Sequence, residues 1–147
     1  MFIFAKNPVS VIQGTPAIWH LLLKAGWCNT GGLKILCGGE ALSHSLGKQL
    51  LAASGGFWNV YGPTEATIWS LIERVQTIDE RQHSSIVPIG KPIANTRAYV
   101  FDRNDQLTPI GVIGELYLAG DGLAKEYLNR PELTASSFIA SPLPQEV

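Results

Sequence analysis

The sequence predicts an α/β fold in which a parallel βαβ sheet segment is followed by a β-rich segment. In the first half of the chain, short β-branched and apolar runs alternate with stretches whose apolar residues recur at helical spacing. Glycine follows each of those runs closely, as expected where strands end in turns. In the second half, two β-prone runs are separated by turn-forming Asp, Asn and Gly. The 15 glycines and nine prolines disfavour an all-helical bundle.

The first half is expected to contain three strands joined by two helices. The strands are expected at residues 9–13, 33–37 and 57–60. Thr15 and Pro16 form a typical helix start, a capping residue followed by proline, and Gly26 is a typical helix stop. Ser43 begins the second helix, which ends before the turn at residues 54–56. Because each helix connects two successive strands, the strands should be parallel with right-handed crossovers.

The second half is expected to contain an antiparallel pair and a final helix. The pair is expected at residues 98–101 and 115–118, around the turn residues Asp102 and Asp105. Because these two aspartates belong to a turn, they are not expected to form a catalytic pair. Pro131 is expected to begin the helix. We place the boundary near residues 73–79, which divides the chain into parts 1–75 and 76–147.

Composition limits the function classes that this sequence can serve. The 147 residues are 46% hydrophobic, too many for a disordered chain, and their net charge of −1 offers no patch for nucleic acid or an anionic membrane. No apolar run approaches the ~20 residues that cross a bilayer, and the first residues do not resemble a signal peptide. The two cysteines, Cys28 and Cys37, match no zinc or redox spacing. We therefore expect a cytoplasmic protein without nucleic-acid or membrane partners.

The segment NVYGPTE, residues 59–65, is expected at the carboxyl end of the third strand, where open parallel sheets collect ligands. Tyr61 offers a flat aromatic face, and Gly62 lets a ligand approach the backbone. Thr64 places a hydroxyl near an expected helix N-terminus, which favours phosphate, and Glu65 offers a hard oxygen ligand for magnesium. The alternative is a glycine-proline turn in which Thr64 caps the next helix, and residue types taken alone favour that alternative.

A second candidate follows the second strand, where Gly38 and Gly39 would let a ring or a phosphate lie against the backbone before Glu40. A plain turn between strand and helix is the alternative. Neither the GxGxxG pattern nor a P-loop occurs, so nicotinamide or flavin enzymes and P-loop kinases or GTPases lose their main support. His20 and the other two histidines share no metal-ligand spacing.

Three segments, in this order along the chain, resemble motifs of one enzyme family. Residues 59–65 resemble the fifth core motif of the adenylation domains of nonribosomal peptide synthetases, which belong to the wider class of adenylate-forming enzymes. Residues 114–134, GELYLAGDGLAKEYLNRPELT, resemble the sixth core motif, which Phe138 continues, and residues 87–93, VPIGKPI, resemble the connector between the two. The likeness covers nearly the whole chain. It implies an internal segment of the large N-terminal subdomain of such an enzyme.

This resemblance implies the amino-acid and ATP substrates, Mg²⁺, and a carrier-protein domain whose phosphopantetheine thiol accepts the activated acyl group. The nucleotide-binding residues that it implies are Gly39, Glu40, Asn59, Tyr61, Gly62 and Thr64. Asn59 would hydrogen-bond the adenine amino group, Tyr61 would stack on the ring, and the backbone at 39–40 would line the adenine slot. Thr64 would contact the α-phosphate and Glu65 would hold Mg²⁺, so these two would serve catalysis directly.

Six further positions match sites that line the amino-acid pocket in this family. They are Gln13, Leu36, Gly38, Val60, Ile68 and Trp69. Because most of them are apolar or aromatic, an uncharged and apolar substrate side chain is expected. Gln13 is the one polar member and would instead favour a substrate that forms hydrogen bonds.

The sequence also departs from the family pattern. The glycine-rich phosphate loop and the aspartate at the start of the pocket are missing, and so are the ribose-binding motif and the lysine-bearing small C-terminal subdomain. Lys125 and Glu126 replace the usual Arg-Gly, which would strain the backbone if that site needs a positive φ. We therefore expect a fragment that is inactive by itself. Two alternatives stay open, a fragment of an acyl- or aryl-acid ligase of the same superfamily and a non-catalytic truncated remnant.

Overall fold

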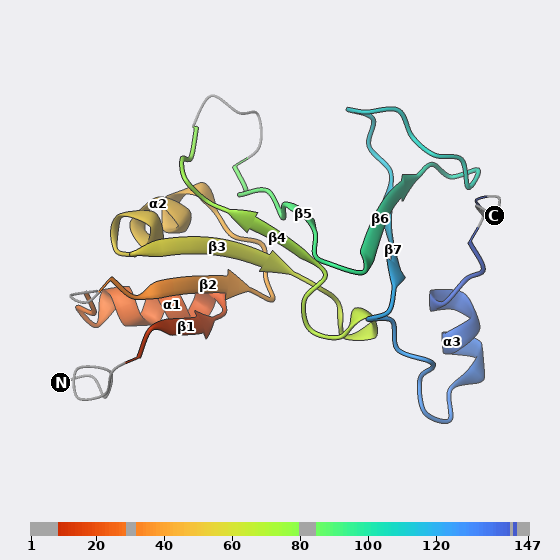
Figure 1. Ribbon diagram of the computed structural model, residues 1–147, viewed down its shortest axis with the longest axis horizontal. Helices are drawn as coiled ribbons and strands as arrows, with labels where there is room; N and C mark the ends of the chain where they lie inside the picture. Colours follow the sequence, from red (N-terminus) through yellow and green to blue (C-terminus); the bar gives the residue numbers. More distant parts are fainter. Residues whose placement is uncertain (1–8, 29–31, 80–84, 142, 144–147) are drawn as a thin grey trace.

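The computed structural model describes residues 9–28, 32–79, 85–141 and 143 (Figure 1). Its elements are β1 (Val11–Gly14), α1 (Pro16–Lys24), β2 (Lys34–Gly38), α2 (His44–Ala52), β3 (Gly56–Tyr61), a 3-10 turn (Thr64–Ala66), β4 (Leu71–Arg74), β5 (Lys91–Pro92), β6 (Thr96–Phe101), β7 (Glu115–Gly120) and α3 (Pro131–Ser137). The five predicted strands are confirmed within two residues, and so are the three helix starts predicted at Thr15–Pro16, Ser43 and Pro131. Among the described residues, no helix is both long and apolar enough to span a membrane.

Strands β1 to β5 form one sheet in sequence order, and β6 and β7 form a separate antiparallel ribbon (Figure 1). The pairs β1–β2 and β2–β3 are parallel, which confirms the predicted βαβαβ unit. The pairs β3–β4 and β4–β5 are antiparallel, so the sheet is mixed. The strand β4 lies before the proposed boundary and β5 lies after it, yet both belong to the first sheet. The division into parts 1–75 and 76–147 stays a prediction.

The strand β4 has no counterpart among the predicted elements. It forms because the backbone reverses after Tyr61: the amide of Ser70 donates to the carbonyl of Tyr61 at 2.7 Å, and Tyr61 pairs with Leu71 in the ladder that follows. A run of four residues is too short for its hydrophobic pattern to be told from a loop. The partner strand, rather than the local sequence, therefore creates this element.

Local capping signals explain where the first two helices begin. The Thr15 hydroxyl accepts a hydrogen bond from the amide of Ile18 at 3.4 Å, and the Ser43 hydroxyl accepts one from the amide of Leu46 at 3.3 Å. Each satisfies one of the amides that a helix start leaves without an intrahelical partner. Gly26, with a φ of 78°, follows the end of α1 in the left-handed conformation that glycine adopts without strain. Both predicted starts and the predicted stop are confirmed.

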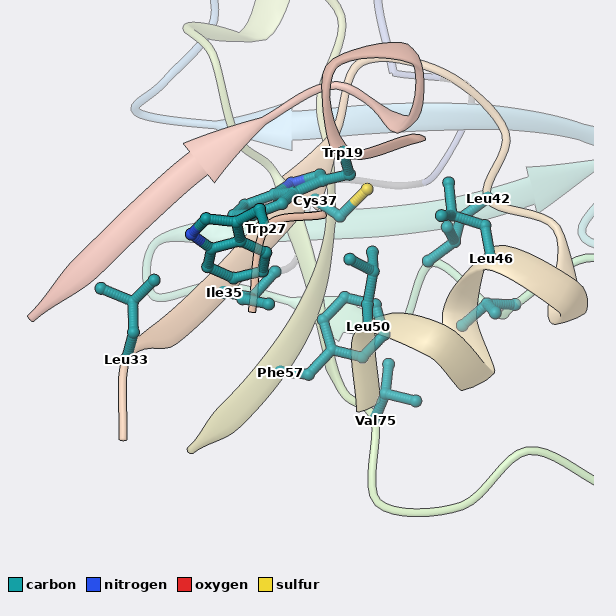
Figure 2. Packing of buried hydrophobic residues seen from close by; sticks show 11 residues of the cluster. Trp19, Trp27, Leu33, Ile35, Cys37, Leu42, Leu46, Leu50, Phe57 and Val75 are labelled. Atoms are coloured by element: carbon teal, nitrogen blue, oxygen red, sulfur yellow. The ribbon is translucent and has the colours of Figure 1, made fainter. Parts of the chain in front are cut away.

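The core lies between the helices α1 and α2 and one face of the sheet (Figure 2). Its buried members are Trp19, Trp27, Leu33, Ile35, Cys37, Leu42, Leu46, Leu50, Phe57, Val75 and Val87. The rings of Trp19 and Trp27 lie 5.5 Å apart, and the Trp19 indole N–H donates to the carbonyl of Leu36 at 3.2 Å. A buried indole therefore has its polar group satisfied, as burial requires.

The two cysteines differ in exposure and therefore in reactivity. Cys28 is exposed, whereas burial, assisted by the nearby Glu40 charge, raises the pKa of the Cys37 thiol to about 12. Because the thiolate is the reactive form, we expect iodoacetamide at about pH 8 to modify Cys28 and spare Cys37 in the folded protein. Mass spectrometry of the alkylated protein checks this. A Cys28→Ser control should abolish labelling until denaturant is added, and equal labelling of both thiols in the folded protein would contradict the prediction.

Candidate functional site

The carboxyl ends of β1, β2 and β3 lie side by side in the parallel part of the sheet. Leu36 of β2 pairs with Gln13 of β1, and Gly38 pairs with Val60 of β3. Paired residues on neighbouring strands point to the same face of a sheet, so these four residues share one face. The alternate positions of β2 point to the other face and belong to the core under α1 and α2. We call the face that Gln13, Leu36, Gly38 and Val60 share the strand-end face.

Trp69 packs on the strand-end face over Gly38. A methyl group built on Gly38 would lie 2.8 Å from Cζ3 of Trp69 and 2.2 Å from the carbonyl oxygen of Val60, so a larger residue does not fit there. Ile68, in contrast, has 64% of its surface exposed. The structure therefore brings five of the six predicted pocket residues together and leaves Ile68 in solvent.

The turn after β3 differs from the expected one. Thr64 begins a 3-10 turn of three residues, and no α-helix follows it. Thr67 and Ile68, with φ values of 54° and 65°, end the turn in the left-handed region and direct the chain into β4. The predicted helix N-terminus at Thr64 is therefore wrong, and so is the alternative in which Thr64 caps a helix. Thr64 is exposed.

Asn59 and Tyr61 occupy β3 on either side of Val60, and their surroundings differ. Asn59 is 3% exposed, and its Nδ2 donates to the carbonyls of Val87 at 3.3 Å and Pro88 at 2.9 Å. These bonds attach the connector at residues 87–93 to the sheet. With Nδ2 committed in this way, Oδ1 is the amide atom suited to accept a hydrogen bond from an adenine amino group. Tyr61 is half-buried.

Gly39 and Glu40 follow β2 on the surface, next to the loop that follows β1. Gly39 has a φ of 89°, and a Cβ built there would have only the methyl carbon of Thr15 nearby, at 3.6 Å. The backbone at this turn is therefore open to a ligand. The positive φ, which glycine tolerates, explains the second glycine of the pair.

Glu65 makes a contact that the sequence analysis does not predict. The hydroxyl of Tyr127 donates to Oε1 of Glu65 across 62 residues of sequence. This hydrogen bond lowers the pKa of the Glu65 carboxyl and raises the pKa of the Tyr127 phenol. Glu65 is therefore a carboxylate, and Tyr127 a neutral phenol, near neutral pH. The only sequence signal for Tyr127 is its place inside the segment at residues 114–134.

An open groove of about 850 Å³ runs beside this contact and is lined by residues of the turn after β3, the β6–β7 ribbon and α3. Tyr61 and Glu65 line it on the side of the sheet. Tyr99, Phe101 and Tyr117 line it on the ribbon side, and the rings of Phe101 and Tyr117 meet edge to face at 5.2 Å. The groove therefore combines aromatic faces with two acidic residues, Glu65 and Glu115, and the basic Arg97.

The described residues contain no group of three or more His, Cys, Asp or Glu side chains that could hold a metal ion. This does not conflict with the magnesium role implied for Glu65, because Mg²⁺ is typically bound through one or two carboxylates, with substrate phosphates and water as the other ligands. Glu65 fits that mode as a charged, partly exposed carboxylate beside a groove.

Among the described residues, the positive φ in the loop after β7 belongs to Asn129 and not to Lys125 or Glu126. The backbone strain that replacing the usual Arg-Gly could cause at these two positions therefore does not occur.

Comparison with known proteins agrees with these features. The profile of the family described as AMP-binding enzyme matches residues 2–128. The chain is 45% identical over 134 residues to a dimodular nonribosomal peptide synthase of Bacillus subtilis (strain 168), which covers 91% of this chain and 6% of that protein.

Two solved structures share the fold. One is a four-domain nonribosomal peptide synthetase bound to AMP and glycine, with a TM-score of 0.85, 45% identity, and coverage of 95% of this chain and 10% of that one. The other is the Klebsiella oxytoca NpsA N-terminal subdomain, with a TM-score of 0.81, 24% identity, and coverage of 95% of this chain and 36% of that one. These similarities confirm the predicted fold class and the resemblance to nonribosomal peptide synthetases. The 147 residues span a small part of these relatives, and the chain belongs to the AMP-binding enzyme family.

Proposed function

We propose that the protein carrying this sequence activates an amino acid by adenylation. The amino-acid carboxylate attacks the α-phosphorus of ATP, pyrophosphate leaves, and an aminoacyl adenylate forms. One observation supports this above the others: Val60 of the strand-end face and Tyr61 of the groove are consecutive residues at the end of β3, in a chain that is 45% identical to a synthetase bound to AMP and glycine. Transfer of the acyl group to the phosphopantetheine thiol of a carrier-protein domain belongs to the same proposal.

In this proposal, the residues after β2 and β3 bind the nucleotide. Tyr61 stacks on the adenine, Oδ1 of Asn59 accepts from its amino group, and the open backbone at Gly39 lines the slot. Thr64 donates its hydroxyl to the α-phosphate. Glu65 holds Mg²⁺, which neutralises charge on the phosphate oxygens as the carboxylate attacks. Little covalent chemistry is asked of the protein, so alignment and charge neutralisation supply most of the rate.

We further propose that the substrate has a small side chain. Support comes from Trp69, whose ring lies over Gly38 on the strand-end face. Leu36 and the buried Val60 surround the same spot. An aromatic ring placed there leaves little volume for a substrate side chain, and the related synthetase is bound to glycine. The sequence predicts an apolar substrate side chain, and this proposal restricts that prediction to small side chains.

The isolated 147-residue chain should not catalyse amino-acid-dependent exchange of pyrophosphate into ATP. The phosphate loop and the C-terminal lysine that the family resemblance implies lie outside these residues, so transition-state charge on the phosphate would go largely uncompensated. Exchange is measured with labelled pyrophosphate and a panel of amino acids, with the complete adenylation domain as the positive control. Clear exchange by the isolated chain would contradict the prediction.

The same assay on the full-length protein tests the function itself. Amino-acid-dependent exchange supports the proposal, whereas preference for a fatty or aryl acid over every amino acid would favour an acyl- or aryl-acid ligase. No exchange with any acid would favour a non-catalytic remnant. The cytoplasmic location expected from the sequence stays a prediction.

A further inference from the structure

Tyr127 is held in place from two directions while its hydroxyl reaches Glu65. Its backbone amide donates to the hydroxyl of Thr134 in α3 at 3.0 Å, and its ring meets Phe138 edge to face at 5.7 Å. Thr134 also donates its hydroxyl to the carbonyl of Arg130 at 2.9 Å, at the start of the same helix. The position of the phenol is therefore set by α3 and its two ends.

The turn that carries Glu65 is attached to the same loop by its backbone. The amide of Ala124 donates to the carbonyl of Glu65 at 2.7 Å. The hydroxyl of Thr67 donates to the carbonyl of Gly122, also at 2.7 Å. These two bonds hold the turn against residues 122–127 even without the side-chain contact. The two segments are therefore already joined without the Tyr127–Glu65 hydrogen bond, and the main effect of that bond is on the Glu65 carboxylate.

We propose that Tyr127 is a positioning residue for Glu65. Its hydroxyl donates to Oε1, which leaves Oε2 as the carboxylate oxygen that binds Mg²⁺ beside the nucleotide phosphates. A glutamate on an exposed turn would otherwise sample several rotamers, and ordering it costs side-chain entropy when the ligand binds. A hydrogen bond to one carboxylate oxygen removes that freedom beforehand. Hydrogen-bond partners of metal ligands commonly change metal affinity by 10–100-fold when they are removed. This inference rests on the proposed function, in which Glu65 holds the metal.

The test replaces Tyr127 by phenylalanine in the full-length protein, since Phe retains the ring that packs on Phe138 and removes only the hydroxyl. We expect the Mg²⁺ concentration for half-maximal exchange to rise about tenfold. The second readout is equilibrium binding of ATP by calorimetry, with Mg²⁺ and with EDTA. In Tyr127→Phe, the affinity in EDTA should stay unchanged while the gain on adding Mg²⁺ shrinks.

Two control variants separate positioning from a general structural effect. Tyr99→Phe removes a phenol hydroxyl from β6 on the opposite wall of the groove and should leave the Mg²⁺ dependence unchanged. Thr134→Val removes the bond that holds the Tyr127 amide and keeps the phenol, so it should raise the Mg²⁺ concentration for half-maximal exchange in the same direction as Tyr127→Phe, but by less. In the double variant with Glu65→Gln, the Tyr127→Phe change should have no further effect on Mg²⁺ dependence.

The outcomes separate this inference from the proposed function. If the wild-type protein exchanges pyrophosphate but Tyr127→Phe shows the wild-type Mg²⁺ dependence, the positioning role is wrong while the function stands. Equal loss of ATP affinity with Mg²⁺ and with EDTA would also overturn it, because Tyr127 would then serve only the shape of the site. If Tyr127→Phe does not fold, Thr134→Val decides: a shift in Mg²⁺ dependence supports the inference, and none overturns it. Absence of amino-acid-dependent exchange in the wild-type protein would instead overturn the proposed function.

Discussion

Replacing Glu65 by glutamine in the full-length protein is expected to lower amino-acid-dependent exchange by about 100-fold at fixed Mg²⁺. Glutamine keeps the size of the side chain and can still accept from Tyr127, but it lacks the charge that a hard divalent cation requires. The loss should be partly relieved by raising Mg²⁺, because the metal still binds through the phosphates. The measurement is the exchange rate across a Mg²⁺ series.

A matched control is Glu132→Gln, which removes an exposed carboxylate from the first turn of α3. It changes the net charge by the same amount and should leave the exchange rate and its Mg²⁺ dependence unaffected. If Glu65→Gln retained the wild-type dependence, the assignment of Glu65 as the metal ligand would be wrong. In that case the carboxylate would serve only the hydrogen bond with Tyr127.

The second large effect is expected when Trp69 is replaced by alanine. The ring then leaves the strand-end face over Gly38, and the space that it vacates can admit a larger substrate side chain. The ratio of exchange with valine or leucine to exchange with glycine should rise about 10-fold or more, since each methylene accommodated in a pocket is worth roughly 10–200-fold in discrimination. The assay is exchange with a panel of amino acids of increasing side-chain size.

Trp58→Ala provides the comparison for this change. Trp58 pairs with Leu36 and so shares the face, but it lies two residues before Val60 and stacks near Arg74 at 5.7 Å. Removing it should weaken packing without changing which amino acid is preferred. An unaltered preference in Trp69→Ala, or an equal change in both variants, would contradict a selective role for Trp69.

Local patterns predict much of this fold because their signals act over a few residues. Thr15 and Ser43 cap the helices that follow them, since their hydroxyls meet amides three residues ahead. Strand β6 is followed by a turn in which the Asp102 carboxylate accepts from the amides of Asn104 at 2.8 Å and Gln106 at 3.0 Å. Such contacts join residues that are close together along the chain, so local sequence patterns can predict them.

Local sequence patterns predict only part of the candidate site. The strand-end face follows from the parallel order, because register brings the ends of β1, β2 and β3 together. The turn at Thr64 does not follow, since two left-handed residues after it replace the expected helix. Family resemblance named Glu65, but nothing in the sequence pairs it with a tyrosine 62 residues away.

The sequence by itself determined the alternation of strands and helices, the capped helix starts and the family. Only the tertiary structure decided the antiparallel β4, the bonds from Asn59 to the connector, and the contact between Glu65 and Tyr127. The physical reason is range: propensity and capping depend on neighbours along the chain, whereas these three features arise when segments distant in sequence come to satisfy one another's polar groups and pack together.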